Sequence, residues 1–272
     1  VYNKYQISKS GWIDNNTLGI IKWEVTVKCN DKNSTLKGKT ITDNMLKAGQ
    51  KVSIKIGNDT IDATVASDGE LVLPDSIGDN NEVVISYETK VADYDLGDPD
   101  SSGYYSVKNT AGIDGFHSDK TVYYKPVNEK SKTVLDISQN GSKVTYKWQV
   151  EVKQTNGSFR GKTISDIMNA ASNDGKSIKS VLDPDSIIMY VQRNGKGSYE
   201  TLNSSNYTVV PNADNTSFEI KFNDSEEFDN INLVQIQYSS TVDVTGLDAG
   251  TIINVNNKAA YKGETFGPSA DK

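Results

Sequence analysis

The stretch "IIKWEVTVKCNDKNSTLKGKTITDNML" at residues 20–46 decides the fold, because the chain repeats it as "TYKWQVEVKQTNGSFRGKTISDIMN" at residues 145–169. Both copies hold a Lys-Trp pair in an alternating apolar and polar segment, then a turn, and then Gly-Lys-Thr-Ile-(Thr/Ser)-Asp. Farther along, "VVISYETKV" at 83–91 matches "VQIQYSSTV" at 234–242. Matched segments in the same order indicate a duplicated structural unit.

The length of the chain fits this duplication, since 272 residues are enough for two domains that each bury a core. The polar stretch "DKTVYYKPVNEKSK" separates the two copies. We therefore predict a boundary at Pro126, with one domain at residues 1–126 and a second at residues 127–272. The second domain is the longer, and we expect its insertion "DSIIMYVQRNGKGSYETLNSSNYTVV" to add strands.

Period-two alternation in the repeated segments predicts β-strands. Trp23 and Val25 share one face in the first copy, as Trp148 and Val150 do in the second, with polar residues between them. Only "TDNMLKAGQ" and "SDIMNAASND" suggest a short helical turn. Many short strands separated by Asn, Gly and Asp turns are typical of an antiparallel sandwich. The predicted fold class is all-β, with two tandem immunoglobulin-like β-sandwich domains.

The composition excludes several classes of protein. A net charge of −7 without a basic cluster argues against a nucleic-acid partner, and no apolar run approaches the roughly 18 residues of a membrane helix. The single cysteine, Cys29, allows no intramolecular disulfide, and the single histidine, His117, excludes most metal sites and histidine-based triads. We therefore expect no cofactor, no metal and no membrane contact. Because the chain opens at "VYNKYQ" without a signal peptide, we expect it to be a segment of a longer protein.

Two asparagines fall in phase with apolar residues, so their side chains should point into a core. In "YYSVKNTAG", Asn109 shares the phase of Val107 and Ala111, and in "TIINVNNKAAY", Asn257 shares the phase of Val255. A buried amide without a hydrogen-bond partner costs free energy. The same costly placement in both copies indicates a specific role for the two asparagines.

Charged residues show the same inward phase. Asp43 in "KTITDNM" and Asp166 in "KTISDIM" are each in phase with the isoleucine two residues earlier, and Lys9 in "YNKYQISKSG" is in phase with Ile7. A lysine and an aspartate in a core are expensive to desolvate. We therefore expect a compensating interaction between the inward-facing polar residues of each domain.

These residues resemble the A-type isopeptide domains of Gram-positive surface proteins, which include collagen adhesins and pilin subunits. The resemblance rests on a lysine on the first strand, the "TIxD" aspartate and the "NxA" asparagine on the last strand, in two copies that cover nearly the whole chain. It implies a self-formed bond between the lysine amine and the asparagine side chain, with the aspartate as the autocatalytic acid/base group. The implied sets, with equal lysine-to-aspartate spacing, are Lys9, Asp43 and Asn109, and Lys132, Asp166 and Asn257.

The proposed chemistry is consistent with burial. Burial lowers the pKa of a lysine and raises that of an aspartate, so both can be neutral in a core. A neutral amine is a nucleophile, and a protonated carboxyl can polarise the amide carbonyl and pass protons to departing ammonia. Folding holds amine and amide together, which supplies the effective concentration that a reaction in solution lacks. The product is an uncharged amide, so most of the cost of burial disappears.

The second lysine has two possible assignments. Two more residues separate Lys132 from Trp148 than separate Lys9 from Trp23, so Lys132 requires a longer hairpin. Leu135 is also out of phase with Lys132. Lys130 is the alternative nucleophile.

The expected function is that of a structural or adhesive segment of a Gram-positive cell-surface protein, extracellular and attached to the cell wall. Its expected partners are neighbouring domains of the same surface protein. It is not expected to be an enzyme, since the crosslinking acts only on the chain itself. The alternative is an adhesin region that traps a host extracellular-matrix protein, such as collagen, between its two domains. Trp12 and the tyrosines of "TVYYKPV", Tyr123 and Tyr124, are then the candidate apolar contacts.

Two further readings of the carboxylates are disfavoured. The acidic stretch "DYDLGDPDSSG" at 93–103 does not fit the spacing of a helix–loop–helix calcium loop and has no counterpart in the second copy, so a solvated loop is favoured over a calcium site. A glycan-processing enzyme needs two convergent carboxylates in a cleft. The only repeated carboxylates are Asp43 and Asp166, which are expected to be buried.

Overall fold

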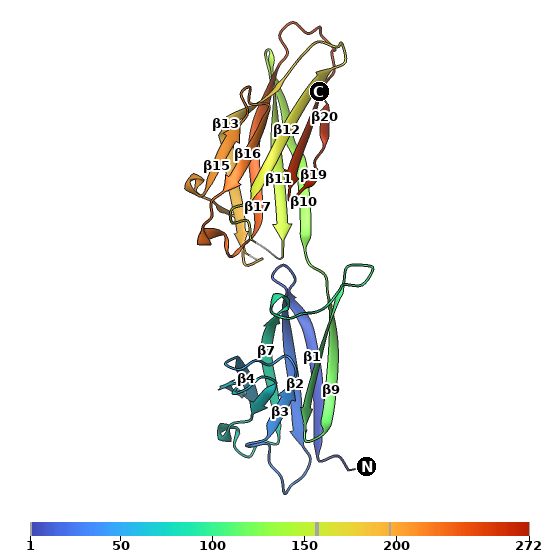
Figure 1. Cartoon of the computed structure of the whole chain (residues 1–272), viewed down its shortest axis with the longest axis vertical. Helices are drawn as coiled ribbons and strands as arrows, with labels where there is room; N and C mark the ends of the chain where they lie inside the picture. Colours follow the sequence, from blue (N-terminus) through green and yellow to red (C-terminus); the bar gives the residue numbers. More distant parts are fainter. Residues whose placement is uncertain (1, 156–157, 196, 272) are drawn as a thin grey trace. The chain divides into compact units, whose positions relative to one another are not determined.

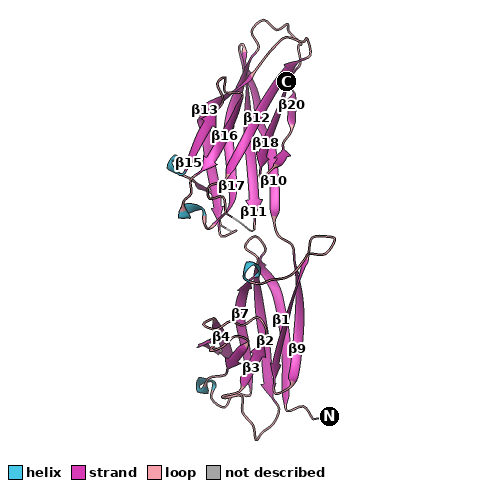
Figure 2. Cartoon of the chain, viewed as in Figure 1, coloured by secondary structure: helices cyan, strands magenta, loops and turns pink. Residues whose placement is uncertain are grey.

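The computed structural model describes residues 2–155, 158–195 and 197–271. In these ranges the regular structure is β-strand, apart from short 3₁₀ helices (Figure 2). The chain divides into two compact units, Val1–Pro126 and Val127–Lys272, each with its own hydrophobic core. In Figure 1 the first unit is coloured from blue to green and the second from green to red. The predicted all-β sandwich class is confirmed. No described helix is long and apolar enough to cross a membrane.

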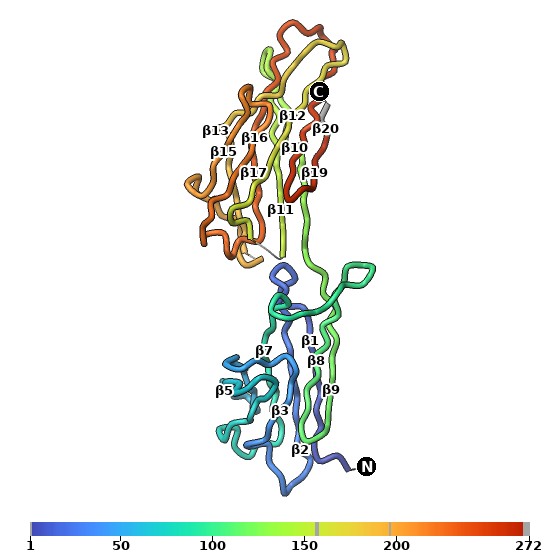
Figure 3. Tube along the Cα trace, in the orientation of Figure 1, coloured from blue at the N-terminus to red at the C-terminus, as the bar shows by residue number. Residues whose placement is uncertain are grey.

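The first unit is a sandwich of two antiparallel sheets. Its strands are β1 (Tyr5–Asn15), β2 (Ile20–Cys29), β3 (Thr40–Asp43), β4 (Lys51–Ile56), β5 (Asp59–Thr64), β6 (Glu70–Val72), β7 (Glu82–Lys90), β8 (Tyr105–Ile113) and β9 (Phe116–Tyr124), with 3₁₀ helices η1 (Asp75–Ile77) and η2 (Val91–Asp93). One sheet has the order β1-β2-β7-β4-β5 and the other β6-β3-β8-β9. Figure 3 shows β1 beside β8 and β9, so the first and last strands are neighbours across the two sheets.

The second unit repeats this arrangement with additional strands. Its elements are β10 (Asn128–Asn140), β11 (Lys143–Gln154), β12 (Thr163–Ser172), β13 (Ser180–Arg193), β14 (Glu200–Thr201), β15 (Tyr207–Pro211), β16 (Ser217–Phe222), β17 (Ile231–Asp243), β18 (Ile253–Tyr261), β19 (Glu264–Phe266) and β20 (Ser269–Asp271), with 3₁₀ helices η3 (Ser204–Asn206) and η4 (Glu226–Phe228). The sheets have the orders β10-β11-β17-β13-β14 and β15-β16-β12-β18-β19, and β20 also pairs with β18. The predicted insertion contains β14 and most of β13, and it ends in β15.

A tryptophan lies in each core at the duplicated position. Trp23 on β2 and Trp148 on β11 are fully buried. Each indole N–H donates to a hydroxyl on the neighbouring strand, Thr89 Oγ1 at 2.8 Å and Ser240 Oγ at 2.9 Å. Because an unpaired buried donor costs about 1–3 kcal/mol, both cores need such a partner. The two units therefore share core chemistry as well as strand order.

The expected helical turn after the Thr-Ile-(Thr/Ser)-Asp motif is wrong in both units. In the first unit β3 ends at Asp43, and hydrogen-bonded turns rather than a helix lead to β4. In the second unit β12 continues through the same region to Ser172, paired with β16 as far as Ile167 and with β18 as far as Ser172. Met168 on this strand faces the core at 2% exposure. Pairing with two neighbours outweighs the local preference for a turn, because tertiary context overrides weak propensities.

Candidate functional site

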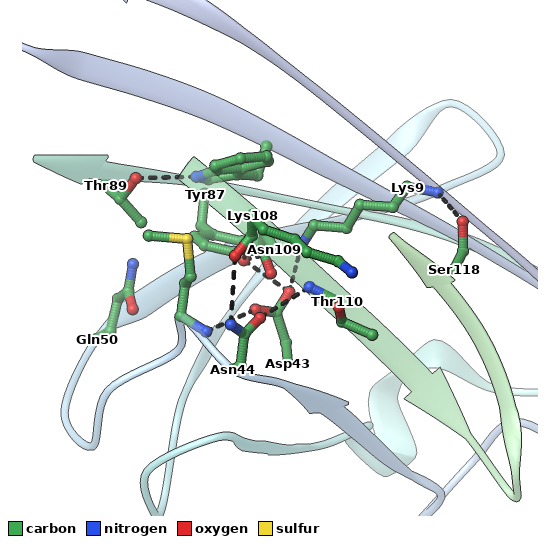
Figure 4. A network of polar contacts seen from close by, with 12 residues as sticks. Lys9, Asp43, Asn44, Gln50, Tyr87, Thr89, Lys108, Asn109, Thr110 and Ser118 are labelled. Carbon is green, nitrogen blue, oxygen red and sulfur yellow. Dashed lines mark hydrogen bonds and ion pairs between the residues drawn. The ribbon is translucent and has the colours of Figure 1, made fainter. Parts of the chain in front are cut away.

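Three strands position the lysine, the aspartate and the asparagine of the first unit. Lys9 lies on β1, paired with Val25 of β2, and its side chain points inward. Asp43 is the last residue of β3, and Asn109 lies on β8, where Asp43 pairs with Ala111. Asp43 and Asn109 are thus on neighbouring strands of one sheet, and Lys9 approaches them from the other sheet (Figure 4).

The polar atoms of the first unit form a closed cluster around a tyrosine. Lys9 Nζ contacts Asp43 Oδ2 and donates to the hydroxyl of Tyr87 at 2.9 Å. The Tyr87 hydroxyl donates to Asp43 Oδ2 at 2.6 Å and accepts from Asn109 Nδ2 at 2.6 Å. The other carboxylate oxygen, Asp43 Oδ1, accepts the backbone N–H of Met45 at 3.0 Å. Asn109 Oδ1 has no partner among the described residues.

The second unit brings together the same four residue types. Lys132 Nζ contacts both Asp166 Oδ2 and Asn257 Oδ1. The Tyr238 hydroxyl donates to Asp166 Oδ2 at 2.6 Å and accepts from Asn257 Nδ2 at 2.9 Å. Asp166 pairs with Ala259 in the sheet, as Asp43 does with Ala111 in the first unit. The amine and the asparagine side chain of the second unit are therefore in direct contact.

Burial sets the electrostatics of both clusters. The exposed fractions are 8% for Lys9, 6% for Lys132, 2% for both aspartates and 0% for both asparagines. Burial lowers the pKa of the Lys9 amine and lowers that of Lys132 to about 8, against the opposing attraction of the neighbouring aspartate. Burial likewise raises the pKa of the Asp166 carboxyl, although Lys132 opposes this shift. Both shifts favour the neutral forms, which are those that nucleophilic attack by the amine requires.

The structure places Lys132, and not Lys130, beside the aspartate and the asparagine. Lys132 pairs with Val150 on β11, the position that matches Val25 opposite Lys9. The β10–β11 hairpin has longer paired arms, and a bulge at Leu135 shifts the register between Val134 and Asp136. The bulge reverses the phase along β10, because one extra residue moves the following side chains to the other face.

The alternative lysine lies outside the cluster. Lys130 Nζ donates to Asn128 Oδ1 at 3.0 Å and forms an ion pair of 2.6 Å with Glu264. Its ammonium is also 5.9 Å from the ring centroid of Tyr261. The side-chain amide among these partners is that of Asn128, two residues away on the same strand, so the described contacts of Lys130 do not include Asn257.

Tyr87 and Tyr238 are the members of the site that the sequence interpretation missed. The two segments that contain them were matched as repeats, and neither tyrosine was given a polar role. The signal was available, because "VVISYETKV" and "VQIQYSSTV" place a tyrosine at the same position and in phase with the core. A buried tyrosine hydroxyl normally requires a hydrogen-bond partner. Each tyrosine pairs across the sheet with the core tryptophan, Trp23 or Trp148.

The remaining sequence candidates lie away from the two clusters. Trp12 and Tyr123 are exposed by 43% and 60%, whereas Tyr124 is buried in the core of the first unit. In the acidic stretch, Asp95 accepts the N–H of Gly97, and Asp100 accepts N–H groups of its own loop. Within the part of the chain that the structure describes, no group of three or more His, Cys, Asp or Glu side chains is placed to hold a metal ion.

Several solved structures are similar to this chain, each at low sequence identity. No protein-family model matches this sequence, and no curated protein matches it either. Similar solved structures include the collagen adhesin CNA from S. aureus (12% identity, 99% of this chain and 93% of that one, TM-score 0.31). Another is the C-terminal domain of the Streptococcus agalactiae AgI/II polypeptide BspA (12% identity, 98% and 99%, TM-score 0.35). A third is the C-terminal domain of the Streptococcus pyogenes antigen I/II-family protein AspA (12% identity, 99% and 99%, TM-score 0.35).

Proposed function

We propose that each unit forms an intramolecular isopeptide bond, Lys9 to Asn109 in the first and Lys132 to Asn257 in the second. In this reaction the lysine Nζ attacks the asparagine Cγ, the Nζ–Cγ bond forms, the Cγ–Nδ2 bond breaks and ammonia leaves. The aspartate, Asp43 or Asp166, accepts a proton from the amine and supplies the one that the leaving nitrogen needs. The reaction is autocatalytic and acts only on the chain itself.

The single observation that supports this proposal most strongly is the repeated cluster of a buried lysine, an aspartate and an asparagine. A buried ion pair is weak evidence for stability, because desolvation offsets its attraction. Two such pairs at equivalent positions, each near a fully buried amide, therefore favour a chemical role. Conversion to an amide removes both charges from the core, which explains why the cluster can be buried.

The bonds would stabilise each unit against unfolding and against force. Lys132 and Asn257 are 125 residues apart, and they lie on the first and the last long strand of their unit. By analogy with disulfides, closing a loop of about 100 residues adds roughly 4 to 5 kcal/mol through the entropy of the unfolded chain. Tension applied to the ends cannot extend the chain between the linked residues, so the greater effect is kinetic.

This chemistry fits a structural or adhesive segment of a Gram-positive cell-surface protein, extracellular and attached to the cell wall. Such a protein needs covalent reinforcement outside the cell. A chain with one cysteine cannot obtain it from an intramolecular disulfide. Neighbouring domains of the same surface protein are the proposed partners, since a clamped unit transmits load along the chain.

The mass of the intact chain tests the proposal. Each bond expels one ammonia, so two bonds lower the mass by about 34 Da from the value calculated from the sequence. Peptide mapping should recover one branched peptide that joins the segments around Lys9 and Asn109, and another that joins those around Lys132 and Asn257. Folded protein with the full calculated mass would exclude crosslinking in both units.

Binding of a host extracellular-matrix protein such as collagen is a second candidate function. The observation that favours it is the exposure of two large aromatic side chains, Trp12 and Tyr123, because exposed apolar groups of this size occur often at binding surfaces. Collagen immobilised on a sensor surface should then bind the chain, and Trp12→Ala and Tyr123→Ala should weaken the binding. Val72→Ala, at another exposed apolar position, is the matched control. Equal responses from all variants would exclude a role for the two aromatic residues.

A further inference from the structure

The leaving nitrogen of the proposed reaction does not contact the aspartate in either unit. Asn109 Nδ2 and Asn257 Nδ2 instead donate to a tyrosine hydroxyl, at 2.6 Å and 2.9 Å. The same hydroxyl donates to the aspartate Oδ2 at 2.6 Å in both units. The described contacts therefore give the aspartate a path to the leaving nitrogen that passes through the tyrosine oxygen.

We propose that Tyr87 and Tyr238 are catalytic residues that relay a proton from the aspartate to the departing nitrogen. This inference rests on the isopeptide reaction proposed above and assigns a further residue to it. In the folded, unreacted unit the amide N–H points at the tyrosine oxygen. When the amine attacks, Nδ2 loses its amide conjugation and gains a basic lone pair. The hydrogen bond between Nδ2 and the hydroxyl can then reverse its direction.

The proton transfers balance through one turnover. The lysine ammonium first gives a proton to the aspartate, and the neutral amine then attacks Cγ. The tyrosine gives its O–H proton to Nδ2 as the Cγ–Nδ2 bond breaks, and it takes the carboxyl proton in exchange. The aspartate, again ionised, takes the second proton from Nζ. The products are an amide with one N–H, a protonated aspartate, an unchanged tyrosine and neutral ammonia.

The relay requires a hydroxyl that stays protonated, and the surroundings of both tyrosines provide this. Burial, with the adjacent aspartate, raises the pKa of Tyr87 and of Tyr238 above the ordinary value. The phenol therefore remains both a donor and an acceptor while the aspartate changes its protonation state. Phe218 packs edge-to-face on Tyr238 at 5.0 Å between ring centroids, which helps to hold the hydroxyl in place.

The comparison of the two units supports the same assignment. The contacts of the lysine differ, because Lys9 Nζ donates to Tyr87 while Lys132 Nζ contacts Asn257. The series of hydrogen bonds from asparagine Nδ2 to the tyrosine hydroxyl and from that hydroxyl to aspartate Oδ2 is present in both. A tyrosine that only filled space between the sheets would not need a hydroxyl at this position.

The test replaces each tyrosine by phenylalanine in the full chain and follows ammonia loss in each unit. The chain is made in a cell-free reaction, synthesis is stopped, and samples taken over time are digested and analysed for branched peptides. Tyr238→Phe should slow crosslinking in the second unit by roughly 10²- to 10⁴-fold, the usual contribution of a general acid. The first unit of the same molecules should keep its wild-type rate, and Tyr87→Phe should give the reverse pattern.

Tyr261→Phe is the matched control. Tyr261 is buried in the second unit, and its hydroxyl donates to Gln154 Oε1 at 3.1 Å, outside the cluster. The same loss of a buried hydroxyl should therefore leave the crosslinking rate unchanged. Circular dichroism of each variant verifies that it folds.

A second measurement separates proton transfer from positioning. Fluorinated tyrosine at position 238 keeps the ring and the hydroxyl but makes the phenol more acidic. If the hydroxyl transfers a proton, the crosslinking rate should change several-fold and its pH profile should shift. A hydroxyl that only holds the amide would leave both unchanged, which would overturn the relay. This measurement also tests whether the hydroxyl transfers a proton if a phenylalanine variant fails to fold.

The outcomes for the relay and for the proposed function are distinguishable. Wild-type chain without any mass deficit contradicts the isopeptide bonds themselves. Wild-type chain that crosslinks, with phenylalanine variants that crosslink at the same rate, contradicts only the relay. Slow crosslinking confined to the unit that carries the substitution, with a normal Tyr261→Phe control, supports it.

Discussion

The two units use the same four residue types but surround the aspartate differently. Asp43 Oδ1 accepts the backbone N–H of Met45 at 3.0 Å, whereas Asp166 Oδ1 has no partner among the described residues. The cause is strand length. β3 ends at Asp43, so the chain turns and brings the Met45 N–H back to the carboxylate, while β12 continues to Ser172 as a paired strand. A repeated motif therefore does not guarantee a repeated environment.

The edge strand that pairs with the asparagine-bearing strand also differs between the two units. In the first unit β9 is continuous, and its Lys120 pairs with Asn109. In the second unit the equivalent edge breaks between β19 and β20, and Asn257 N–H donates to the carbonyl of Pro268 at 3.2 Å. Proline has no N–H to return, so the ladder is interrupted there. Lys132 is thus covered by an irregular segment, and Lys9 by a regular strand.

The largest effect that would distinguish the units is loss of one bond without loss of the other. Asp166→Ala should abolish crosslinking in the second unit and restore about 17 Da, and Asp43→Ala should do the same in the first, because each removes its acid/base group. Intact mass and peptide mapping measure the result. Lys130→Ala is the control and should keep both bonds. A variant without its aspartate that still lost two ammonia molecules would show that another group transfers the protons.

Loss of a bond should also lower the stability of that unit alone. Asn109→Ala prevents the first crosslink and should reduce the free energy of unfolding of the first unit by roughly 4 to 5 kcal/mol, the entropy of the closed loop. Hydrogen exchange measured by mass spectrometry resolves the two units within one chain. Asn257→Ala should reverse the pattern. Equal acceleration of hydrogen exchange in both units would show that the two units do not unfold independently of each other.

The pH dependence of an uncrosslinked second unit gives the next largest effect. In Asn257→Ala the Lys132 amine remains, with a pKa of about 8 in the folded unit against an ordinary 10.5. Between these values the unfolded chain binds more protons, so the free energy of unfolding should rise with pH, by on the order of 3 kcal/mol. Asp166 acts oppositely, since its raised pKa contributes stability that is lost as pH rises through that pKa.

Denaturant titrations from pH 7 to 11 measure this dependence in the variant and in the wild type. A wild type that carries the proposed bond has no Lys132 amine to titrate, so it should lack the rise. The same rise in both proteins would mean that Lys132 is still an amine in the wild type. Asn109→Ala should show a rise of the same sign, because burial also lowers the pKa of Lys9.

The smallest predicted effect concerns the irregular edge of the second unit. Gly267 has φ +130°, and a Cβ there would lie 2.6 Å from Asn257 O and 2.9 Å from Lys132 Cδ. Gly267→Ala should therefore destabilise the second unit by about 1–3 kcal/mol through overpacking and backbone strain. Gly250→Ala is the control, with φ +87° but open space around the added methyl, so its cost should be smaller. The melting temperatures of the two variants give the comparison. An equal decrease in both would show that the contacts of the added methyl group with Lys132 and Asn257 do not contribute to the destabilisation.

The sequence alone was sufficient for the features that depend on local order. The duplication, the all-β class and the inward direction of Lys9, Asp43 and Asn109 could all be read from it. The reason is that alternation has a period of two in any strand, so the phase of a residue predicts its face whatever strand lies beside it. The same rule left Lys132 ambiguous, since the bulge at Leu135 breaks the period.

The tertiary structure decided everything that depends on contacts between sheets. Tyr87 and Tyr238 reach the aspartate and the asparagine only because β7 and β17 lie opposite β3–β8 and β12–β18 in their sandwiches. The Met45 N–H reaches Asp43 because a turn, and not a longer strand, follows that residue. Such contacts are set by how two sheets pack and where strands end, and both are determined by the whole core rather than by any short segment.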